Sequence, residues 1–242
     1  MAKSTKRSDR RAVVEQMRRE QKRAEKRRAY AIVAACVLVA LVIIGIGAYP
    51  LLKQQQVSSG TLASLGADAS QADCQDVTTK PATGSAEHKP EGSTIPYSEA
   101  PPAFGPHYPA PAPMARKYYT TDDRPPVEYL VHNLEHGYNI LWYDETIAKD
   151  SEQRAIVKAI SERFKGTAFK DKFIAAPWTS KDGDPFPGGA HVALTHWSMG
   201  GTQGNDEGQL GVWQYCAQPS GEAVSQFVED YPYTDSPEPN AA

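Results

Sequence analysis

Several motifs that mark common kinds of active site are missing from this chain. No G-x-S-x-G stretch is present, and nothing around Ser198 marks it as an activated nucleophile. The glycine-rich stretch 199–208, MGGTQGNDEG, has no Lys-Ser/Thr pair after it, which argues against a phosphate-binding loop. Asp182 and Asp184 lie in a KDGDP turn without the D-x-[DN]-x-[DN]-G frame of a calcium loop. These absences leave histidine chemistry as the main candidate.

Charged residues are also missing from one long stretch near the N-terminus. Residues 29–52 read AYAIVAACVLVALVIIGIGAYPLL and contain no Asp, Glu, Lys or Arg. A bilayer core needs about 20 apolar helical residues, so this run can cross it once. We therefore expect a single transmembrane helix over residues 29–52.

The charges on either side of this run predict an orientation. Residues 1–28 hold 12 Lys+Arg and 4 Asp+Glu, a net of +8, whereas the remaining residues hold 14 and 25, a net of −11. Because positive flanks stay in the cytoplasm, the basic arm is expected inside and the larger part of the chain outside. The arm interleaves acids with bases beside the membrane, so anionic lipid heads are a simpler partner for it than nucleic acid.

Two other interpretations of the apolar run compete with a membrane anchor. A cleavable signal peptide usually has an apolar region of about 7–15 residues, and this run is longer and lacks a small-x-small site after it. A lipoprotein interpretation depends on residues 33–36, VAAC, but the apolar run continues well past Cys36. Both fit less well than a span.

The chain has only three cysteines, and two of them, Cys74 and Cys216, lie outside the apolar run. An even number of cysteines in an oxidising compartment favours a disulfide between them. The alternative is two free, buried thiols.

Composition divides the outer part into three regions. Residues 53–70 are rich in Ser, Gly and Ala, as is typical of a linker. Residues 71–232 are expected to form one domain, and residues 233–242 a disordered tail. Within the domain, the stretch 101–113, PPAFGPHYPAPAP, is incompatible with a regular helix or a central strand, so it is either an ordered coil or a flexible loop.

Hydrophobic patterns in the rest of the domain predict an α+β fold with a small mixed sheet. Two prolines precede an expected helix over 127–136, and Gly137 is a suitable stop. The other expected elements are helices over 146–165 and from Gly221, and strands over 138–144, 173–178, 191–197 and 212–216. His191 and His196 should point to opposite faces of their strand.

The stretch 128–143, EYLVHNLEHGYNILWY, contains the strongest candidate site. On a helix, His132 and His136 share one face, so both imidazoles could bind one metal ion. His107 comes from the proline-rich stretch, and His88 or Met114 could add a ligand. Imidazoles suit zinc and copper, and a thioether would favour copper. The alternative is that these histidines only form hydrogen bonds to the backbone.

Residues 132–136 also match H-x-x-E-H, an inverted zinc-protease motif in which Glu135 would act as general base. That motif needs a sustained helix and a third, acidic ligand, for which Glu162 is a candidate. Gly137 and the following strand residues end the helix early, so the match is weak.

Three segments, HKPEGSTIPY, PPAFGPHY and VHNLEHGYNILWY, together resemble an actinobacterial family, domain of unknown function 3105. The resemblance covers roughly residues 70–232 and implies one N-terminal membrane anchor, a linker and this domain. Family members carry a PPTSGPH-like loop before an LEHG segment, and here Ala103-Phe104 replace the Thr-Ser pair. The positions that match the family pattern are His88, His107, His132, Glu135 and His136. The family has no established activity.

Three hypotheses follow for the function. The first is a non-catalytic binding module whose histidines hold copper or zinc. The second is a metal-free accessory subunit of a membrane complex, such as a respiratory one. The third is a zinc hydrolase that uses Glu135.

Overall fold

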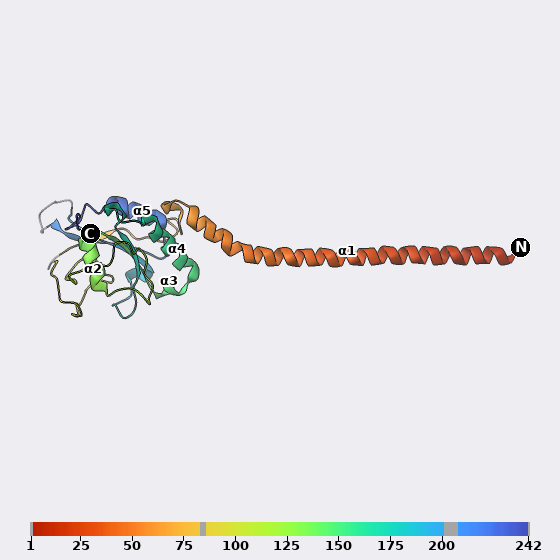
Figure 1. The fold of residues 1–242 in the computed structure, drawn as a ribbon, viewed down its shortest axis with the longest axis horizontal. Helices are drawn as coiled ribbons and strands as arrows, with labels where there is room; N and C mark the ends of the chain where they lie inside the picture. Colours follow the sequence, from red (N-terminus) through yellow and green to blue (C-terminus); the bar gives the residue numbers. More distant parts are fainter. Residues whose placement is uncertain (1, 83–85, 201–207, 242) are drawn as a thin grey trace. The chain divides into compact units, whose positions relative to one another are not determined.

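The computed structural model describes residues 2–82, 86–200 and 208–241. The chain forms two compact units, Met1–Gln56 and Val57–Ala242 (Figure 1). Residues 201–207 of the glycine-rich stretch, and the last residue of the expected tail, lie outside the described residues.

The first unit is part of one long helix, α1 (Ala2–Ser59). Among the described residues, one helical stretch, Met17–Ala48, is long and apolar enough to cross a membrane, with a mean hydropathy of 3.0 over an 18-residue window. Such a stretch fits a membrane anchor or a signal sequence. Residues 53–59, expected in a linker, continue this helix.

The second unit is built on a five-stranded mixed sheet, which confirms the expected α+β class. Its strands are β1 (Thr78–Pro81), β2 (Asn139–Tyr143), β3 (Phe173–Pro177), β4 (Val192–Ser198) and β5 (Leu210–Cys216). The spatial order is β1-β5-β4-β2-β3, with β2 and β3 parallel and the other neighbouring pairs antiparallel. The four expected strands are present as β2 to β5. Strand β1 was not expected, because its sequence TTKP is polar, and all four residues are exposed at the sheet edge.

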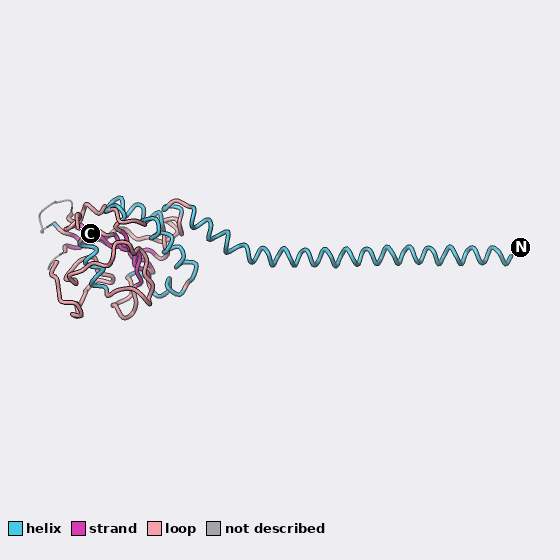
Figure 2. Tube along the Cα trace, in the orientation of Figure 1, coloured by secondary structure: helices cyan, strands magenta, loops and turns pink. Residues whose placement is uncertain are grey.

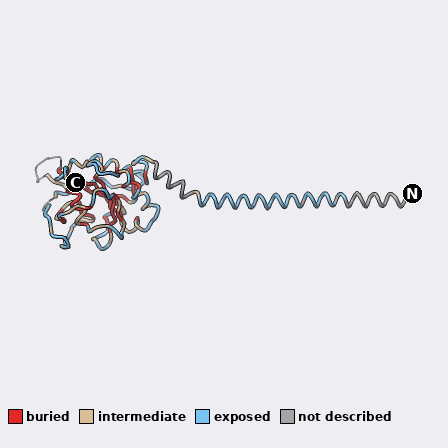
Figure 3. The backbone as a smooth tube through the Cα atoms, in the orientation of Figure 1, coloured by how far each residue is buried: buried red, intermediate tan, exposed pale blue. Residues whose placement is uncertain are grey.

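Both faces of the sheet are covered, and alternate strand residues belong to two apolar clusters. Ile140 and Trp142 of β2 pack with α2 (Val127–Glu135) and the proline-rich stretch. Leu141 and Tyr143 pack on the other face with α4 (Ser151–Ser161) and α5 (Gly221–Asp230). Figures 1 and 2 show these helices around the strands, and Figure 3 shows the buried residues concentrated at the sheet. Successive side chains of a strand point to opposite faces of the sheet, so the residues of β2 contribute alternately to the two apolar clusters.

The expected helix over 146–165 is divided into shorter pieces. Helix α3 (Glu145–Lys149) ends at Asp150, whose carboxylate caps α4 by accepting from two backbone N–H groups, and the last turn is a 3₁₀ helix, Glu162–Phe164. An aspartate at an N-cap competes with helix continuation because its side chain satisfies the amides of the next helix. The apolar stripe predicted the helical residues, but not the break.

The proline-rich stretch is an ordered coil rather than a flexible loop. Ala103, Tyr108 and Ala112 are buried in it. Asn133 of α2 clamps it, because the Asn133 side chain accepts from the Ala112 N–H (2.9 Å) and donates to the Ala112 carbonyl (3.0 Å). The Asn133 amide thus satisfies backbone groups of Ala112 that have no helix or sheet partner in this proline-rich coil.

The expected disulfide is present between Cys74 and Cys216, which are 142 positions apart. The expected disordered tail differs from the structure. Ser236 is buried, and the Lys172 ammonium donates to the carbonyls of Pro239 (2.8 Å) and Ala241 (2.7 Å). The sequence of the tail did not predict this order, because the tail contributes only backbone carbonyls and the lysine that binds them lies elsewhere in the chain.

Gly137 ends α2 where only glycine fits. Its φ is +88°, and an added Cβ would lie 2.3 Å from the Tyr233 carbonyl oxygen. We expect Gly137→Ala to lower the free energy of unfolding by about 2 kcal/mol, from backbone strain and this clash. Gly92→Ala is the matched control, since Gly92 has a φ of +82° with open space around it. Urea unfolding followed by tryptophan fluorescence measures both, and equal losses would contradict the clash.

Candidate metal centre

The C-terminal end of helix α2 and its cap carry three of the candidate side chains, His132, Glu135 and His136. Leu130, Val131 and Leu134 face the core and are fully buried. His132 and His136 lie one turn apart on another face, with their Nε2 atoms 3.0 Å apart, and both are buried. The two nitrogens are at hydrogen-bond distance, and two ligand atoms of one ion would have a similar separation of roughly 3 Å. The two residues belong to different groups of side chains that could hold a metal ion, so one ion shared by this pair stays a prediction.

Two loop segments bring in the other histidines. His88 and His107 form an isolated parallel bridge, in which the Lys89 N–H donates to the His107 carbonyl (2.7 Å) and the His107 N–H donates to the Glu87 carbonyl (3.1 Å). The bridge aligns residues that are far apart in sequence. As a result, both rings reach α2, and their centroids lie 5.1 Å and 4.7 Å from that of His132.

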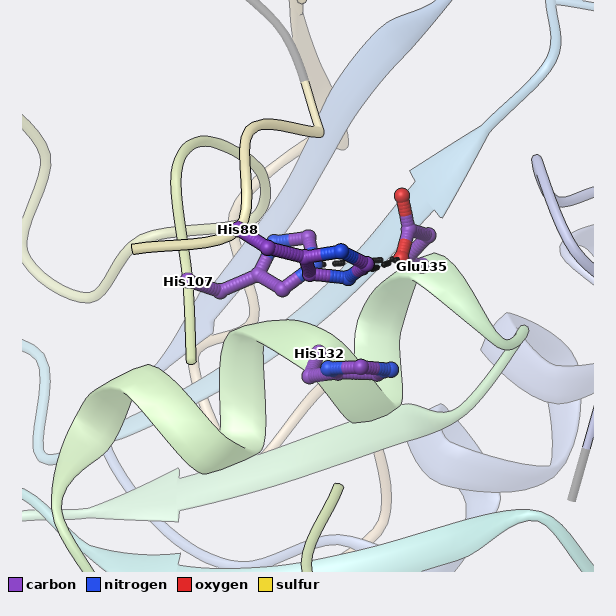
Figure 4. A group of neighbouring side chains, drawn as sticks. All are labelled: His88, His107, His132 and Glu135. Atoms are coloured by element: carbon purple, nitrogen blue, oxygen red, sulfur yellow. Dashed lines mark ion pairs between the residues drawn. The ribbon is translucent and has the colours of Figure 1, made fainter. Parts of the chain in front are cut away.

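These segments converge on Glu135. The Glu135 Oε2 atom lies 3.1 Å from His107 Nε2 and 3.9 Å from His88 Nε2. One ligand atom from each of His88, His107, His132 and Glu135 lies within 4.8 Å of every other. Figure 4 shows the His88 and His107 rings pointing toward the Glu135 carboxylate, with His132 beside them on the helix. We call these four residues the primary cluster; they could hold a metal ion.

The hydrogen bonds behind the rings set which nitrogen faces the cluster. His107 Nδ1 lies 2.8 Å from the Gly105 carbonyl oxygen, and His132 Nδ1 lies 2.6 Å from that of Tyr108. A carbonyl accepts only, so each Nδ1 carries the proton. In a neutral imidazole, Nε2 then presents a lone pair to the cluster. Metal-bound histidines are oriented by backbone carbonyls in this way.

The buried atoms at the centre are left without ordinary partners. His107 Nε2 and Glu135 Oε2 have no hydrogen-bond partner among the described residues, although they are 3.1 Å apart. A lone pair and a carboxylate oxygen repel each other at this distance, and burial without a partner costs about 1–3 kcal/mol per group. Either a shared proton or a cation between them removes that cost.

The protonation states favour ligand chemistry. Burial, reinforced by the neighbouring His136 and His107, lowers the pKa of His132 to about 4 against the Tyr108 hydrogen bond and Glu135, so its imidazole is neutral at pH 7. Burial raises the pKa of Glu135, but His107, His132 and His88 together outweigh it and hold that pKa below its usual value. A neutral imidazole beside a carboxylate anion is the state that metals bind.

The remaining candidates lie elsewhere or in a second position. His136 faces Glu238, with Nε2 and Oε2 3.4 Å apart. Met114 packs half-buried against the apolar cluster of α2. Glu162, the candidate third ligand of a protease-like site, is exposed and pairs with Lys158 at 3.8 Å. Glu162 is therefore not a ligand of the primary cluster.

His191 and His196 occupy opposite faces of β4, as the strand period predicts. His196 is fully buried, with Nδ1 3.2 Å from the Tyr138 carbonyl oxygen and Nε2 2.7 Å from that of Asp235. His191 is partly exposed, and its Nδ1 lies 2.8 Å from an Asp144 carboxylate oxygen. Both serve structural contacts.

Sequence reasoning did not expect two of the site residues as metal ligands. Glu135 matched the family pattern and was considered as a catalytic base, although its position between two histidines put it on the same helical turn. Glu238 lies in a polar tail that gave no signal, and only the packed structure places it beside His136.

Fold and site define the class: an α+β domain with a histidine–carboxylate cluster in which His107, His132 and Glu135 are buried and His88 is exposed, preceded by an apolar helix. The sequence profile described as "Protein of unknown function (DUF3105)" matches residues 88–242, which is more than half of the chain, so this protein belongs to that family. No curated protein and no solved structure matches the chain.

Proposed function

We propose that this protein is a membrane-anchored, non-catalytic module that binds zinc or copper through His88, His107, His132 and Glu135. The observation that carries the proposal is the pair of buried atoms, His107 Nε2 and Glu135 Oε2, which lie 3.1 Å apart and have no hydrogen-bond partner in the described part of the chain. Three imidazoles and one carboxylate form a donor set that suits zinc and copper(II). The primary cluster includes no sulfur ligand, so copper(I) is favoured less.

The proposed location follows from the helix and the disulfide. The apolar stretch of α1 would cross the membrane once, with the basic arm in the cytoplasm against anionic lipid heads. The domain would then face an extracytoplasmic space, which the Cys74–Cys216 disulfide supports because such bonds persist in oxidising compartments. A membrane complex would be the natural context for such a module.

The geometry supports binding better than hydrolysis. A general base must hold its carboxylate toward a metal-bound water, whereas Glu135 Oε2 is buried and lies within ligand spacing of two histidines. Glu135 therefore acts in this proposal as a ligand.

Metal content tests the proposal directly. The full-length chain, purified in detergent with a removable N-terminal tag free of histidine, should retain at least one zinc or copper ion per chain after loading and gel filtration. His107→Gln should weaken that affinity by at least about 100-fold, since loss of a ligand exceeds the 10–100-fold typical of its supporting groups. Elemental analysis and competition with a chelator measure both quantities.

The matched control is His191→Gln, which removes a histidine outside the cluster. This variant should bind metal as the unmodified chain does, and far-UV circular dichroism should show that both variants are folded. An unmodified chain without metal after loading with either ion would contradict the proposal, and would favour the accessory-subunit hypothesis.

A further inference from the structure

The primary cluster does not account for every ligand that converges here. His136 Nε2 lies 3.0 Å from His132 Nε2 and 3.4 Å from Glu238 Oε2. One ligand atom from each of Glu135, His136 and Glu238 lies within 4.8 Å of the others, and Glu135 belongs to both groups. A tetrahedral zinc ion takes four ligands, which the primary cluster already supplies. His136 and Glu238 are therefore in excess of what one ion needs.

We propose that the site holds two metal ions, with Glu135 as the shared carboxylate and with His136 and Glu238 as the other protein ligands of the second ion. This inference rests on the proposed function, since it assumes that the primary cluster binds metal. Paired ions in proteins lie about 3.5–4 Å apart, and His132 and His136, one from each group, bring their Nε2 atoms to 3.0 Å from each other. The buried Glu135 Oε2, which has ion-pair contacts but no hydrogen-bond partner among the described residues, is the second observation that points to a cation here.

Glu238 is held in place by contacts between the tail and the C-terminal end of α2. The Glu238 N–H donates to the Glu135 carbonyl (2.9 Å), which joins the tail directly to the end of α2. The buried Lys172 ammonium donates to the His136 carbonyl (2.7 Å) and also to the carbonyls of Pro239 and Ala241. One lysine thus positions the backbone of His136 together with the residues that follow Glu238.

Each position has one exposed side chain, but the two positions differ in the number of protein ligands. In the primary cluster, the side chains of His107 and Glu135 are 0% and 3% exposed, that of His88 is 50% exposed, and four side chains can bind the ion. In the second position, the Glu238 side chain is 55% exposed, so three protein ligands leave room for water on that side. Zinc sites with three protein ligands keep an open fourth position. The second ion should therefore bind more weakly than the first and exchange more readily.

A zinc titration of the metal-free, full-length chain in detergent, against a competing chelator, tests this inference. The unmodified chain should bind two zinc ions in two steps, and Glu238→Gln should lose the weaker step while the tighter one stays within about 3-fold. Glu229→Gln is the matched control, because Glu229 is an exposed acid on α5 outside both groups. It should still bind two ions.

Copper(II) provides an independent measurement. Two copper ions about 4 Å apart couple magnetically, so the unmodified chain loaded with two equivalents should show a paramagnetic resonance signal well below two spins per chain. Glu238→Gln should show one isolated spin per chain.

The outcomes separate this inference from the proposed function. One zinc ion in both proteins would overturn the two-ion inference and leave the proposed function standing. Two ions in both would overturn the role of Glu238. No zinc in the unmodified chain would overturn both proposals.

Discussion

Zinc added to the metal-free protein at about 100 times its dissociation constant should raise the melting temperature by about 5–11 °C. A ligand that binds only the folded state adds about 2.7 kcal/mol at that excess. For a domain of roughly 150–250 residues, each kcal/mol shifts the melting temperature by about 2–4 °C. The primary cluster cannot exist in the unfolded chain, because its ligands come from three separate segments. Metal binding at this cluster would therefore be coupled to the domain fold.

The change can be followed by tryptophan fluorescence, because all four tryptophans, Trp142, Trp178, Trp197 and Trp213, lie in the domain. Magnesium is the control ion, since it prefers oxygen ligands and should have little effect. His107→Gln should lose most of the zinc-dependent shift. An equal shift in that variant would mean that zinc stabilises the protein from another place.

Removing the disulfide should lower the free energy of unfolding by about 3 kcal/mol. Cys74 and Cys216 are 142 positions apart, so the bond restricts a long loop in the unfolded chain. The double variant Cys74→Ala/Cys216→Ala should still fold, because the Gln75 N–H donates to the Tyr215 carbonyl (2.8 Å) and the Ala217 N–H donates to that of Ala72 (2.8 Å). These bonds hold the same two segments together without the covalent link.

Urea unfolding followed by tryptophan fluorescence measures this loss, which corresponds to a drop in melting temperature of roughly 6–12 °C. Cys36→Ala is the control, since Cys36 is a free cysteine on α1, outside the domain. It should leave domain stability unchanged. A double variant as stable as the unmodified chain would show that the disulfide adds nothing to the stability of this fold.

Local patterns determined most of the elements of this protein. The uncharged run 29–52 predicted a helix able to cross a membrane, because backbone N–H and C=O groups inside a bilayer must form hydrogen bonds with each other. Two prolines before Val127 and Gly137 after Glu135 predicted the ends of α2, since each residue type restricts its own backbone. The bulky, β-branched runs predicted β2 to β5, which the structure confirms. These signals act over a few residues, so no partner is needed to detect them.

Only the tertiary structure decided how the site is assembled. The i,i+4 spacing of His132 and His136 is local, but the approach of His88 and His107 depends on a bridge between two irregular loops. Glu238 lies beside His136 because the buried Lys172 donates to the His136 carbonyl and to two carbonyls of the tail. A lysine can donate to a peptide carbonyl at any distance in the sequence, and a proline-rich coil has no periodic pattern. Neither contact can therefore be predicted from a local sequence pattern. The sequence by itself therefore determined the main elements and the four candidate histidines, whereas packing decided which of them meet and placed Glu238 beside His136.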